Sequence, residues 1–387
     1  MKYLLLLIAC VSVAAQKGIP PKEVVNATIT TKYAQPMPFK PELVSQLKAP
    51  AGYEVIATAS GLGKPRMLYA APNDRLYITR RDAGDVLMLS EPKPDGTFAN
   101  LTTAVSDFKG VHGITMKDGW LFLLNNNELR RYKLLADGTA DMESKQTLIN
   151  DLPSGGQHSN RTMDFGPDGM LYLTVGSVCN DCVGDKETAT VLWVDPKTWQ
   201  RGIYASGLRN TIGIDWHPKT GELWGLDNGS DYKGDNWPPE ELNKLVNGAD
   251  YGFPFGYGKR EIDKTREDPG GTTKEEVVAA SQPSVMEFPA HAAPIAFQFF
   301  TSGGFNGDGL VCWHGSWNRS EPDGFKVERI KFKDGQPVSS EDFLSGFYLK
   351  AANQQFGRPT GLVITANGTV FVSDDSNGVI YRIQPKK

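Results

Sequence analysis

The sequence predicts an all-β protein with the fold of a six-bladed β-propeller, and three observations support this prediction. The chain contains 41 glycines and 25 prolines spread between short apolar runs, which indicates many turns and few long helices. Six segments repeat one order: a polar lead-in, an apolar run, a turn and a second apolar run. The first three repeats begin 47 to 49 residues apart, close to the blade spacing of propellers. A TIM barrel would need a helix between successive strands, and no helical stretch recurs at that interval.

Each repeat predicts the inner strands of one blade. The repeats begin at Lys64, Val111, Asn160, Leu208, Pro294 and Arg358. Their turns read PND, KDG, PDG, PKTGE, NGDG and ANG, and Asn, Asp and Gly tolerate the positive φ of tight hairpins. The flanking runs alternate or are rich in β-branched and aromatic residues, which favours strands. A third apolar piece, such as DVLMLS or GVIYRIQP, predicts a further outer strand for each blade.

The N-terminal 15 residues, MKYLLLLIACVSVAA, have the pattern of a secretory signal peptide. Their apolar run is shorter than the roughly 20 residues that span a bilayer, so we expect a secreted, extracellular protein without a membrane anchor. We expect an N-terminal extension over 16–48 and a catalytic propeller over 49–387, with an inserted loop region at about 227–290. The net charge of −4 gives no overall attraction to nucleic acid or to anionic membranes.

Three cysteines remain once Cys10 leaves with the signal peptide. Cys179 and Cys182 form a C-x-x-C pair, for which a small disulfide that pins a loop is the expected role in a secreted protein. A zinc site would need two further ligands, and no second C-x-x-C or H-x-x-x-H motif exists. Cys312 lies in the apolar run LVCWHG, and we expect it to be a buried free thiol.

Polar residues stand immediately before several of the predicted inner strands. They are His112, His158, Arg161, Arg209, Asn210 and Arg358. Any one of them alone is explained most simply as a solvated loop residue. In a propeller, however, such lead-ins converge at one end of the central channel, and a pocket with several polar groups is the usual pattern of a binding site.

The segment 226–258 is rich in carboxylates, with Asp227, Asp231, Asp235, Glu240 and Glu241 close together. Hard oxygen ligands of this kind suit calcium. The spacing of an EF-hand is missing, and acidic loops are most often only solvated. From these residues alone, a metal site and a solvated loop both stay open.

Several segments together resemble the soluble pyrroloquinoline quinone (PQQ)-dependent sugar dehydrogenases. The similarity is to the sorbosone dehydrogenase-like and fungal pyranose dehydrogenase branch, and to glucose dehydrogenase-like propellers. It extends from about Ala49 to the end of the chain. The segments that carry it are GGQHSNRTMDFGPDGMLYLTVG, YASGLRNTIGIDWHP, LDNGSD, PPEELNKLVNGADYGFPF, CWHGSWNR and GRPTGLVITANGTVFVSDD.

This resemblance implies the central chemistry. His158 would be the base that takes a proton from the anomeric or a nearby hydroxyl of a sugar, an aldose, pyranose or keto-aldose, while hydride passes to PQQ. Arg209 and Asn210 match the family's arginine–asparagine pair, and the guanidinium would stabilise the negative charge that grows on the quinone oxygen.

The resemblance also implies a Ca²⁺ ion that polarises the quinone carbonyl. Its protein ligands would be the backbone carbonyls of Gly229 and Ser230, with Asp231 and Asp235 supplying negative charge nearby. Related bacterial glucose enzymes have Gly-Pro at this position, whereas this chain has Gly-Ser. Carbonyl donation survives that difference, although the loop loses the stiffness of proline.

PQQ carries three carboxylates, so its site requires cations. Arg358 and Arg319 are the first choices, because a guanidinium fork suits a carboxylate. Further expected cofactor contacts are His314, Asn318, Lys326, His112 and Arg161. His217 stands at the other end of its hairpin and is expected to be structural, and for His291 a structural and a site role stay open.

Electrons would pass to an external acceptor, because no haem domain and no carbohydrate-binding module is recognisable in the sequence. A haem or copper redox protein is the acceptor that the resemblance suggests. Two other functions compete with sugar oxidation: a calcium-dependent, lactonase-like hydrolase, and a non-catalytic sugar-binding propeller. Lactonase-like propellers hold calcium with side-chain carboxylates and Asn in the channel, whereas cationic residues crowd the lead-ins here.

Overall fold

The computed structural model describes residues 30–153 and 156–386, and most regular structure in this part of the chain is β-strand. The predicted signal peptide at 1–15 lies outside the described residues. The described helices are short: α1 (Lys274–Ala280), η1 (Pro41–Gln46), η2 (Gly303–Phe305) and η3 (Lys350–Ala352). None of these helices has the length and apolar character needed to cross a membrane.

Within the described residues, six sheets have four or five strands each. The first contains β3 (Leu68–Ala71), β4 (Arg75–Arg80), β5 (Asp85–Pro92) and β6 (Phe98–Val105); the second β7 (Gly113–Lys117), β8 (Trp120–Leu124), β9 (Leu129–Leu134) and β10 (Ala140–Ile149); the third β11 (Met163–Phe165), β12 (Leu171–Val175), β13 (Thr190–Val194), β14 (Arg201–Ser206) and β18 (Ala249–Asp250). The fourth contains β15 (Thr211–Trp216), β16 (Leu223–Asp227), β17 (Glu240–Leu245) and β21 (Met286–Phe288); the fifth β22 (Pro294–Phe299), β23 (Gly309–Trp313), β24 (Lys326–Lys333) and β25 (Gln336–Leu344); the sixth β28 (Pro359–Ile364), β29 (Val370–Asp374), β30 (Val379–Pro385) and β2 (Tyr53–Ala59).

The six predicted repeats supply the first two strands of these six sheets, as the hairpin pattern indicates. The turns have the expected backbone: φ is +58° at Asp74 and +51° at Asp118, a region that Asp adopts more readily than most residues. The second strands β12, β16 and β29 are buried along their whole length, because neighbouring sheets cover both of their faces.

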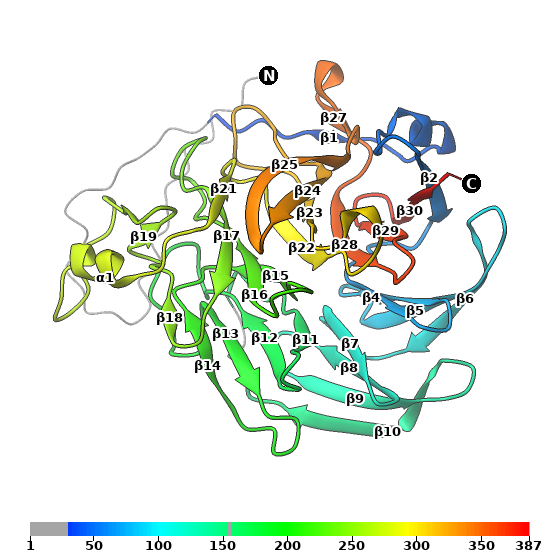
Figure 1. Cartoon of the computed structure of the whole chain (residues 1–387), viewed down its shortest axis with the longest axis horizontal. Helices are drawn as coiled ribbons and strands as arrows, with labels where there is room; N and C mark the ends of the chain where they lie inside the picture. The colour runs from blue at the N-terminus through cyan, green and yellow to red at the C-terminus, as the bar shows by residue number, and fades with distance from the viewer. Residues whose placement is uncertain (1–29, 154–155, 387) are drawn as a thin grey trace.

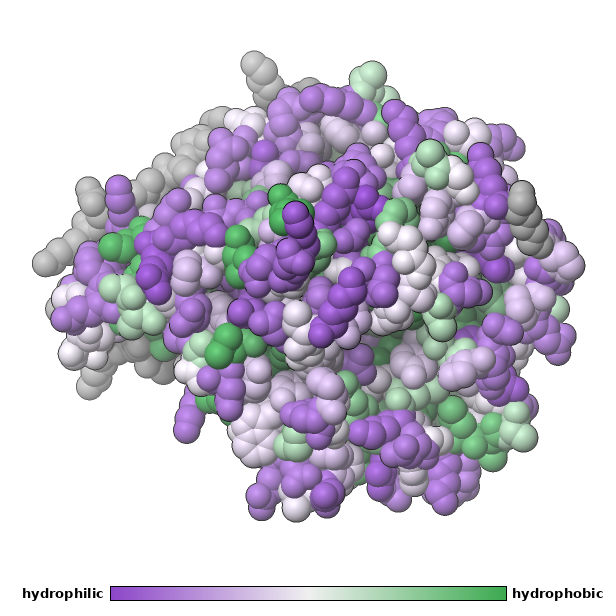
Figure 2. All heavy atoms as spheres, in the orientation of Figure 1, coloured by the Kyte–Doolittle hydropathy of each residue, from purple (hydrophilic) through white to green (hydrophobic). Residues whose placement is uncertain are grey.

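The sheets pack face to face in succession, and the sixth packs against the first. Each of six clusters of buried apolar side chains is shared by two neighbouring sheets. The first strands β3, β7, β11, β15, β22 and β28 contact one another in that order, and β28 contacts β3. Figure 1 shows the sheets set around a common centre. This arrangement is consistent with a β-propeller. On the face shown in Figure 2, hydrophilic side chains predominate and hydrophobic ones are scattered.

The sixth sheet joins the two ends of the described chain. Its outer strand β2 pairs antiparallel with β30, with Tyr53 opposite Pro385. A smaller sheet adds a further link between distant segments: β1 (Gln35–Pro36) pairs with β27 (Gln354–Gln355), which also pairs with β26 (Tyr348–Leu349).

The region expected as an insertion, 227–290, is partly regular. Strands β17 and β21 within it complete the fourth sheet, and β18 adds an edge strand to the third. The hairpin of β19 (Gly256–Tyr257) and β20 (Glu261–Ile262) contacts α1. Figure 1 shows α1 and β19 at the periphery of the molecule.

Strand direction brings two kinds of connection to one end of the sheets. Because neighbouring strands are antiparallel, the segment that leads into each first strand lies at the same end as the connection between the second and third strands. We call this the lead-in end. Apart from Lys326, which lies in β24, the predicted site residues stand in these two kinds of segment.

Candidate functional site

His158 lies between β10 and β11, at the lead-in end, and its ring is oriented by one residue. Nδ1 is 2.9 Å from the carbonyl oxygen of Ser177 and 2.9 Å from its hydroxyl. A carbonyl oxygen can only accept, so Nδ1 carries the proton and donates it. The Ser177 hydroxyl donates in turn to the carbonyl of Cys179, at 2.7 Å. In this tautomer Nε2 keeps a free lone pair, which is the atom a general base uses.

The surroundings of His158 disfavour its charged form. Burial, followed by the positive charge of Arg209, lowers the pKa of His158 to about 3, against the opposing hydrogen bond to Ser177. The positive charge of Arg161 contributes to the same lowering of the His158 pKa. The imidazole is therefore neutral at physiological pH and ready to accept a proton.

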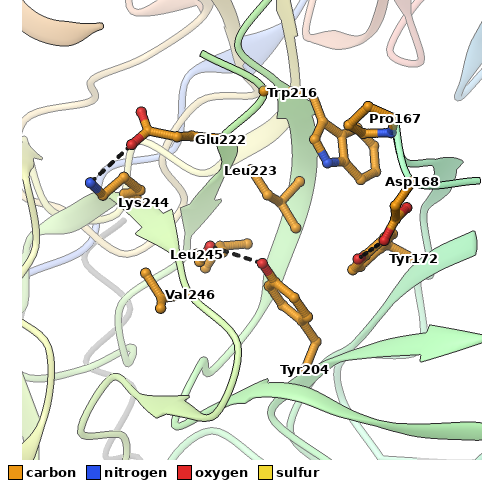
Figure 3. Close-up of a pocket in the computed structure, with 11 residues that line it drawn as sticks. Pro167, Asp168, Tyr172, Tyr204, Trp216, Glu222, Leu223, Lys244, Leu245 and Val246 are labelled. Atoms are coloured by element: carbon orange, nitrogen blue, oxygen red, sulfur yellow. Dashed lines mark hydrogen bonds and ion pairs between the residues drawn. The ribbon is translucent and has the colours of Figure 1, made fainter. Parts of the chain in front are cut away.

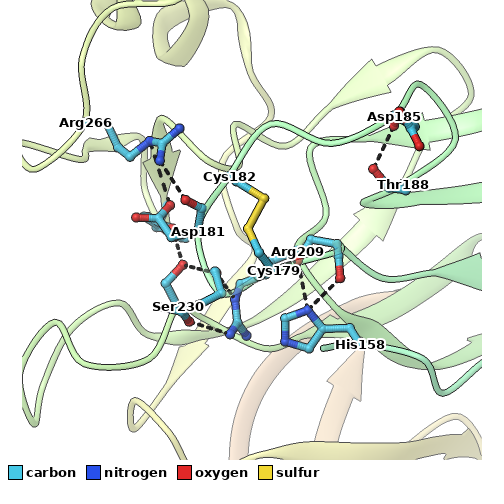
Figure 4. Close-up of a disulfide and its surroundings, with 12 residues drawn as sticks. His158, Cys179, Asp181, Cys182, Asp185, Thr188, Arg209, Ser230 and Arg266 are labelled. Atoms are coloured by element: carbon cyan, nitrogen blue, oxygen red, sulfur yellow. Dashed lines mark hydrogen bonds and ion pairs between the residues drawn. A yellow bond between two sulfur atoms is a disulfide. The ribbon is translucent and has the colours of Figure 1, made fainter. Parts of the chain in front are cut away.

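Arg209 is almost completely buried and held by hydrogen bonds on several sides (Figure 4). Its Nε donates to the carbonyl of Asn180 at 2.7 Å, and NH1 donates to the carbonyl of Asn228 at 3.3 Å. NH2 donates to the carboxylate of Asp231 at 2.9 Å. The guanidinium thus has one fixed position next to His158.

The Arg209–Asn210 pair meets His158 across the backbone of Gly176. A Cβ atom added to Gly176 would lie 2.6 Å from Cβ of His158 and 2.7 Å from Oδ1 of Asn210. The backbone N–H groups of Arg209 and Asn210 donate to the buried carboxylate of Asp227, at 2.9 and 2.8 Å, and burial raises the pKa of Asp227 to about 6. Oδ1 of Asn210 is buried and finds no partner among the described residues. The structure therefore brings His158, Arg209 and Asn210 together.

Gly229 and Ser230, the expected calcium ligands, lie in the connection between β16 and β17. The N–H of Gly229 donates to Glu240 at 2.9 Å, and the Ser230 hydroxyl is 3.2 Å from the carbonyl of Asn180. No group in the described part of the chain donates to the backbone carbonyls of Gly229 or Ser230. Both oxygens are therefore available as cation ligands.

A buried carboxylate stands next to these carbonyls. The two oxygens of Glu240 accept from the N–H groups of Gly229 and Ala293, both at 2.9 Å, and burial raises the pKa of Glu240 to about 8. A nearby cation stabilises such a carboxylate. Among residues 30–153 and 156–386, no group of three or more His, Cys, Asp or Glu side chains is arranged to hold a metal. A calcium site here would thus depend on backbone oxygens.

The two acidic residues that follow have different positions. Asp231 bridges two predicted site residues, accepting from Arg209 and, at 2.8 Å, from Nδ2 of Asn318. Asp235 accepts from the N–H of Ser320 at 2.9 Å and from its hydroxyl. Asp231 belongs to the site, whereas Asp235 holds the connection between β23 and β24.

A second group of charged side chains spans the fifth, sixth, first and second sheets. Asp375 is 2.8 Å from Nε2 of His314 and 2.5 Å from NH1 of Arg66. NH2 of Arg66 is 3.4 Å from Nε2 of His112, and Arg358 donates to the carbonyl of His314 at 3.1 Å. Burial alone would raise the pKa of Asp375, but the charges of His314, Arg66 and Arg358 outweigh it and lower that pKa below its usual range. Asp375 is thus held directly by Arg66 and His314, while Arg358 acts on it only through its charge.

A cavity of about 180 Å³ opens beside this group. It is lined by Lys64, Arg66, Arg81, Asp82, Asn160 and Asp375. It adjoins the His158 segment, because Arg81 donates to the hydroxyl of Ser159 at 2.9 Å. Nε of Arg66 and Oδ1 of Asn160 are buried without a partner in the described structure. Lys64 pairs with Asp82 and Arg66 with Asp375, so the charge of Arg81 and the unpaired Nε–H of Arg66 are what the cavity offers to an anionic ligand.

His112 and Arg161 hold the backbone around His158 through hydrogen bonds. His112 is fully buried, and its Nδ1 donates to the carbonyl of Arg161 at 2.9 Å. Arg161 donates to the carbonyls of His158, at 2.6 Å, and Pro153, at 3.0 Å, and burial lowers the pKa of Arg161 to about 10. This geometry favours a role in holding the His158 segment over the expected direct contact with a cofactor.

The structure does not bring Arg319 or Lys326 to this group. The Arg319 guanidinium donates to backbone carbonyls, including that of Ala290 at 2.7 Å. Lys326 forms an ion pair with Asp342 at 2.8 Å, on the outer strands of the fifth sheet. Their cofactor role stays a prediction that this geometry does not support.

The two remaining histidines are structural in this geometry. Nδ1 of His217 accepts from the N–H of Thr220 at 3.2 Å, and its ring packs on Phe299, which confirms the expected structural role. His291 is buried and donates to the carbonyl of Gly234 at 2.8 Å. It therefore fixes the connection that contains Gly229 and Ser230.

The cysteine predictions are confirmed. Cys179 and Cys182 form a disulfide, and Cys312 is a buried free thiol.

Four residues of the site were not predicted from the sequence: Arg66, Ser177, Asn180 and Asp375. Arg66 lies in the lead-in of the first repeat, KPRMLY, so the rule that selects Arg358 could have selected it too. The other three lie in connections between second and third strands, which a search of the lead-ins does not cover.

A larger cavity, of about 360 Å³, lies at the opposite end of the third and fourth sheets (Figure 3). Tyr172, Tyr204 and Trp216 line it. Its charged groups are already paired: Asp168 accepts from Tyr172 at 2.8 Å, and Lys244 pairs with Glu222 at 3.1 Å. It contains none of the predicted site residues.

The chain is similar in sequence to a family of known proteins and to individual relatives. A profile described as TrAA12-like matches residues 47–386. An uncharacterised protein of Borreliella burgdorferi is 28% identical over 89% of this chain and 93% of its own length. A pyrroloquinoline quinone-dependent sugar dehydrogenase of Hypocrea jecorina is 24% identical over 86% of this chain and 88% of its own length.

Two solved structures show a shared fold. The calcium structure of the Trichoderma reesei enzyme of carbohydrate-active family AA12 has a TM-score of 0.78 at 21% identity, covering 93% of this chain and 99% of that one. The holo form of the PQQ domain of Coprinopsis cinerea pyranose dehydrogenase has a TM-score of 0.75 at 20% identity, covering 90% and 98%.

Proposed function

The chain belongs to the TrAA12-like family, and on that basis we propose that it is a quinoprotein oxidoreductase that oxidises a sugar with PQQ as its cofactor. The observation that carries the proposal is the neutral His158 ring. Its Nδ1 proton is donated to Ser177, and its Nε2 has no hydrogen-bond partner among the residues that the structure describes, next to the buried Arg209.

The chain's own groups would divide the work as follows. Nε2 of His158 accepts the proton of a sugar hydroxyl at or near the anomeric carbon. Ser177 keeps the ring in the required tautomer, and Arg209 supplies a fixed positive charge where negative charge develops. Bound PQQ would supply the two-electron acceptor chemistry.

The lead-in end fits this cofactor. PQQ is an anion with three carboxylates, and the cavity lined by Lys64, Arg66 and Arg81 offers positive charge beside the His158 segment. Buried, unpaired polar atoms remain on Arg66, Asn160 and Asn210, as expected where a polar ligand completes the hydrogen bonding.

The proposal has four further parts. The six packed sheets would be the blades of a six-bladed propeller, and the free carbonyls of Gly229 and Ser230 would hold Ca²⁺ as a Lewis acid. The protein would be secreted after loss of residues 1–15. It would pass electrons to an external acceptor, such as a haem or copper protein.

Reconstitution tests the proposal directly. Purified metal-free protein is titrated with PQQ and Ca²⁺ while the quinone absorbance is followed, and dye reduction is then measured with a panel of sugars. We expect a saturable change in absorbance and turnover with at least one sugar. An unchanged spectrum together with no dye reduction by any sugar would overturn the proposal.

A calcium-dependent lactonase is the second candidate function, because related propellers with a central calcium hydrolyse lactones. The same protein, loaded with Ca²⁺ alone, is therefore assayed on aldonolactones. Hydrolysis without PQQ, with no dye reduction in its presence, would favour the lactonase.

A further inference from the structure

The connection between β12 and β13 contains a small disulfide ring, Cys179 to Cys182, and one residue inside it contacts Arg209. The carbonyl of Asn180 accepts from Nε of Arg209 at 2.7 Å, and its side-chain Oδ1 accepts from NH2 at 2.8 Å. A single residue thus accepts from both nitrogens, Nε and NH2, on one edge of the guanidinium.

Asn180 also binds the connection that carries the expected calcium ligands. Its Oδ1 accepts from the N–H of Asp231 at 2.8 Å, and its Nδ2 donates to the Asp231 carbonyl at 3.1 Å. The hydroxyl of Ser230 lies 3.2 Å from the Asn180 carbonyl. One asparagine therefore joins Arg209 to the segment 229–231.

The ring that holds Asn180 is itself fixed on two sides. The Cys179 carbonyl accepts from the Ser177 hydroxyl, which touches Nδ1 of His158. On the other side, Asp181 pairs with Lys233 at 2.7 Å, and its carbonyl accepts from Arg266 at 2.6 Å. The disulfide closes this four-residue ring and limits the conformations that Asn180 can adopt.

The partners of Asn180 set it apart from an ordinary loop asparagine. Asn125, in the connection between β8 and β9, makes two of its three side-chain bonds within its own turn, where it accepts from the N–H groups of Asn127 and Glu128; the third goes to the carbonyl of Lys109, 16 positions away. The side chain of Asn180 instead bonds to residues 29 and 51 positions away. It links segments of the site and does not build its own turn.

We propose that Asn180 is a positioning residue that holds the Arg209 guanidinium beside His158 and couples it to the 229–231 segment, and that the Cys179–Cys182 disulfide keeps Asn180 in place. The inference rests on the proposed function, since it assigns a role within the same site.

The test compares Asn180→Ala with the matched control Asn125→Ala, because each substitution removes three side-chain hydrogen bonds. The His158 pKa is measured by NMR on the metal-free protein, with the signal assigned from the spectrum of His158→Ala. Arg209 disfavours the imidazolium, so a loosened Arg209 raises the His158 pKa. We expect a rise of about one pH unit in Asn180→Ala and no change in Asn125→Ala.

Two further readouts separate positioning from general destabilisation. Calorimetry with Ca²⁺ alone should show about tenfold weaker binding for Asn180→Ala. In the reconstituted enzyme, kcat should fall about 10- to 100-fold with a smaller change in KM, as expected for weakened charge-assisted hydrogen bonds. Asn125→Ala should lower thermal stability by a similar amount and leave all three readouts unchanged.

Reduction of the folded wild-type protein with dithiothreitol tests the disulfide without a substitution. It should raise the His158 pKa and weaken Ca²⁺ binding in the same direction as Asn180→Ala. If neither treatment changes the His158 pKa or the Ca²⁺ affinity, the positioning role is wrong. The NMR titration needs no substrate, so it decides this role even if the protein oxidises no sugar.

Discussion

The acid side of the pH–activity profile should depend on the His158 imidazole. A general base works only when it is unprotonated, and burial together with the Arg209 charge lowers the pKa of His158 to about 3. We therefore predict that kcat/KM of the reconstituted enzyme stays near its plateau from pH 7 down to pH 5. The acid limb should appear only below that range.

The size of the effect follows from the fraction of neutral imidazole. With the ordinary histidine pKa of about 6.5, about 3% of the rings would be neutral at pH 5, and kcat/KM would fall about 30-fold. With a pKa of about 3, about 99% of the His158 rings are neutral at pH 5. A pKa one unit higher would still leave about 90% neutral.

The assay is the initial rate of dye reduction at low sugar concentration between pH 3.5 and 8, with a dye whose reduction does not consume protons. Samples held at each pH and returned to pH 7 control for unfolding. The substitution Arg209→Met adds a second test: loss of the positive charge favours the imidazolium, so the acid limb should move to higher pH. A wild-type half-loss near pH 6.5 would refute the reasoning about burial and charge.

Further substitutions and metal removal test the other parts of the site. His158→Ala should leave PQQ binding intact, as judged by absorbance titration, while kcat falls about 10²- to 10⁴-fold; unchanged turnover would show that another base acts. Glu240→Gln places an amide N–H against a backbone donor, Gly229 or Ala293, at a cost of about 1–3 kcal/mol. Calorimetry should then show weaker Ca²⁺ binding. An affinity equal to that of the wild type would contradict a calcium site at the carbonyls of Gly229 and Ser230. Arg66→Met should weaken PQQ binding about tenfold or more and leave Ca²⁺ affinity unchanged. Treatment with a chelator should abolish dye reduction, and added Ca²⁺ should restore it; activity that persists in the metal-free protein would exclude an essential calcium.

The fold could be predicted from the sequence because its signals are local. A turn such as PND or KDG and the apolar runs beside it lie within about 16 residues, and each hairpin forms from that short stretch alone. The position of the sheets relative to one another follows from repetition, since each apolar face must be covered by the next sheet.

From the residues alone the site could be predicted only where it follows the repeat, whereas Gly229, Ser230 and Asp231 are expected from the family resemblance. His158, Arg209 and Asn210 directly precede inner strands, and the structure brings them together around Gly176. Asn180 stands in another kind of connection, and its role depends on partners in distant segments.

Distance along the chain also explains why the cationic cavity was not predicted from the sequence. Arg66 and Asp375 are 309 positions apart, and no local pattern links them. For Arg319, the resemblance implies a cation for the cofactor, but the direction of the side chain depends on loop geometry, which turns it towards the Ala290 carbonyl.

The strand pairing that unites β2 with β30 has a consequence for biosynthesis. The partner of Tyr53 is Pro385, so the early strand must wait, with its edge unpaired, until the ribosome has made almost the whole chain. Arg66, which leads into the first sheet, pairs with Asp375, which follows β29 of the sixth sheet. The cationic cavity can therefore form only after translation of the last sheet, and a prematurely terminated chain would lack both its closure and its anion site.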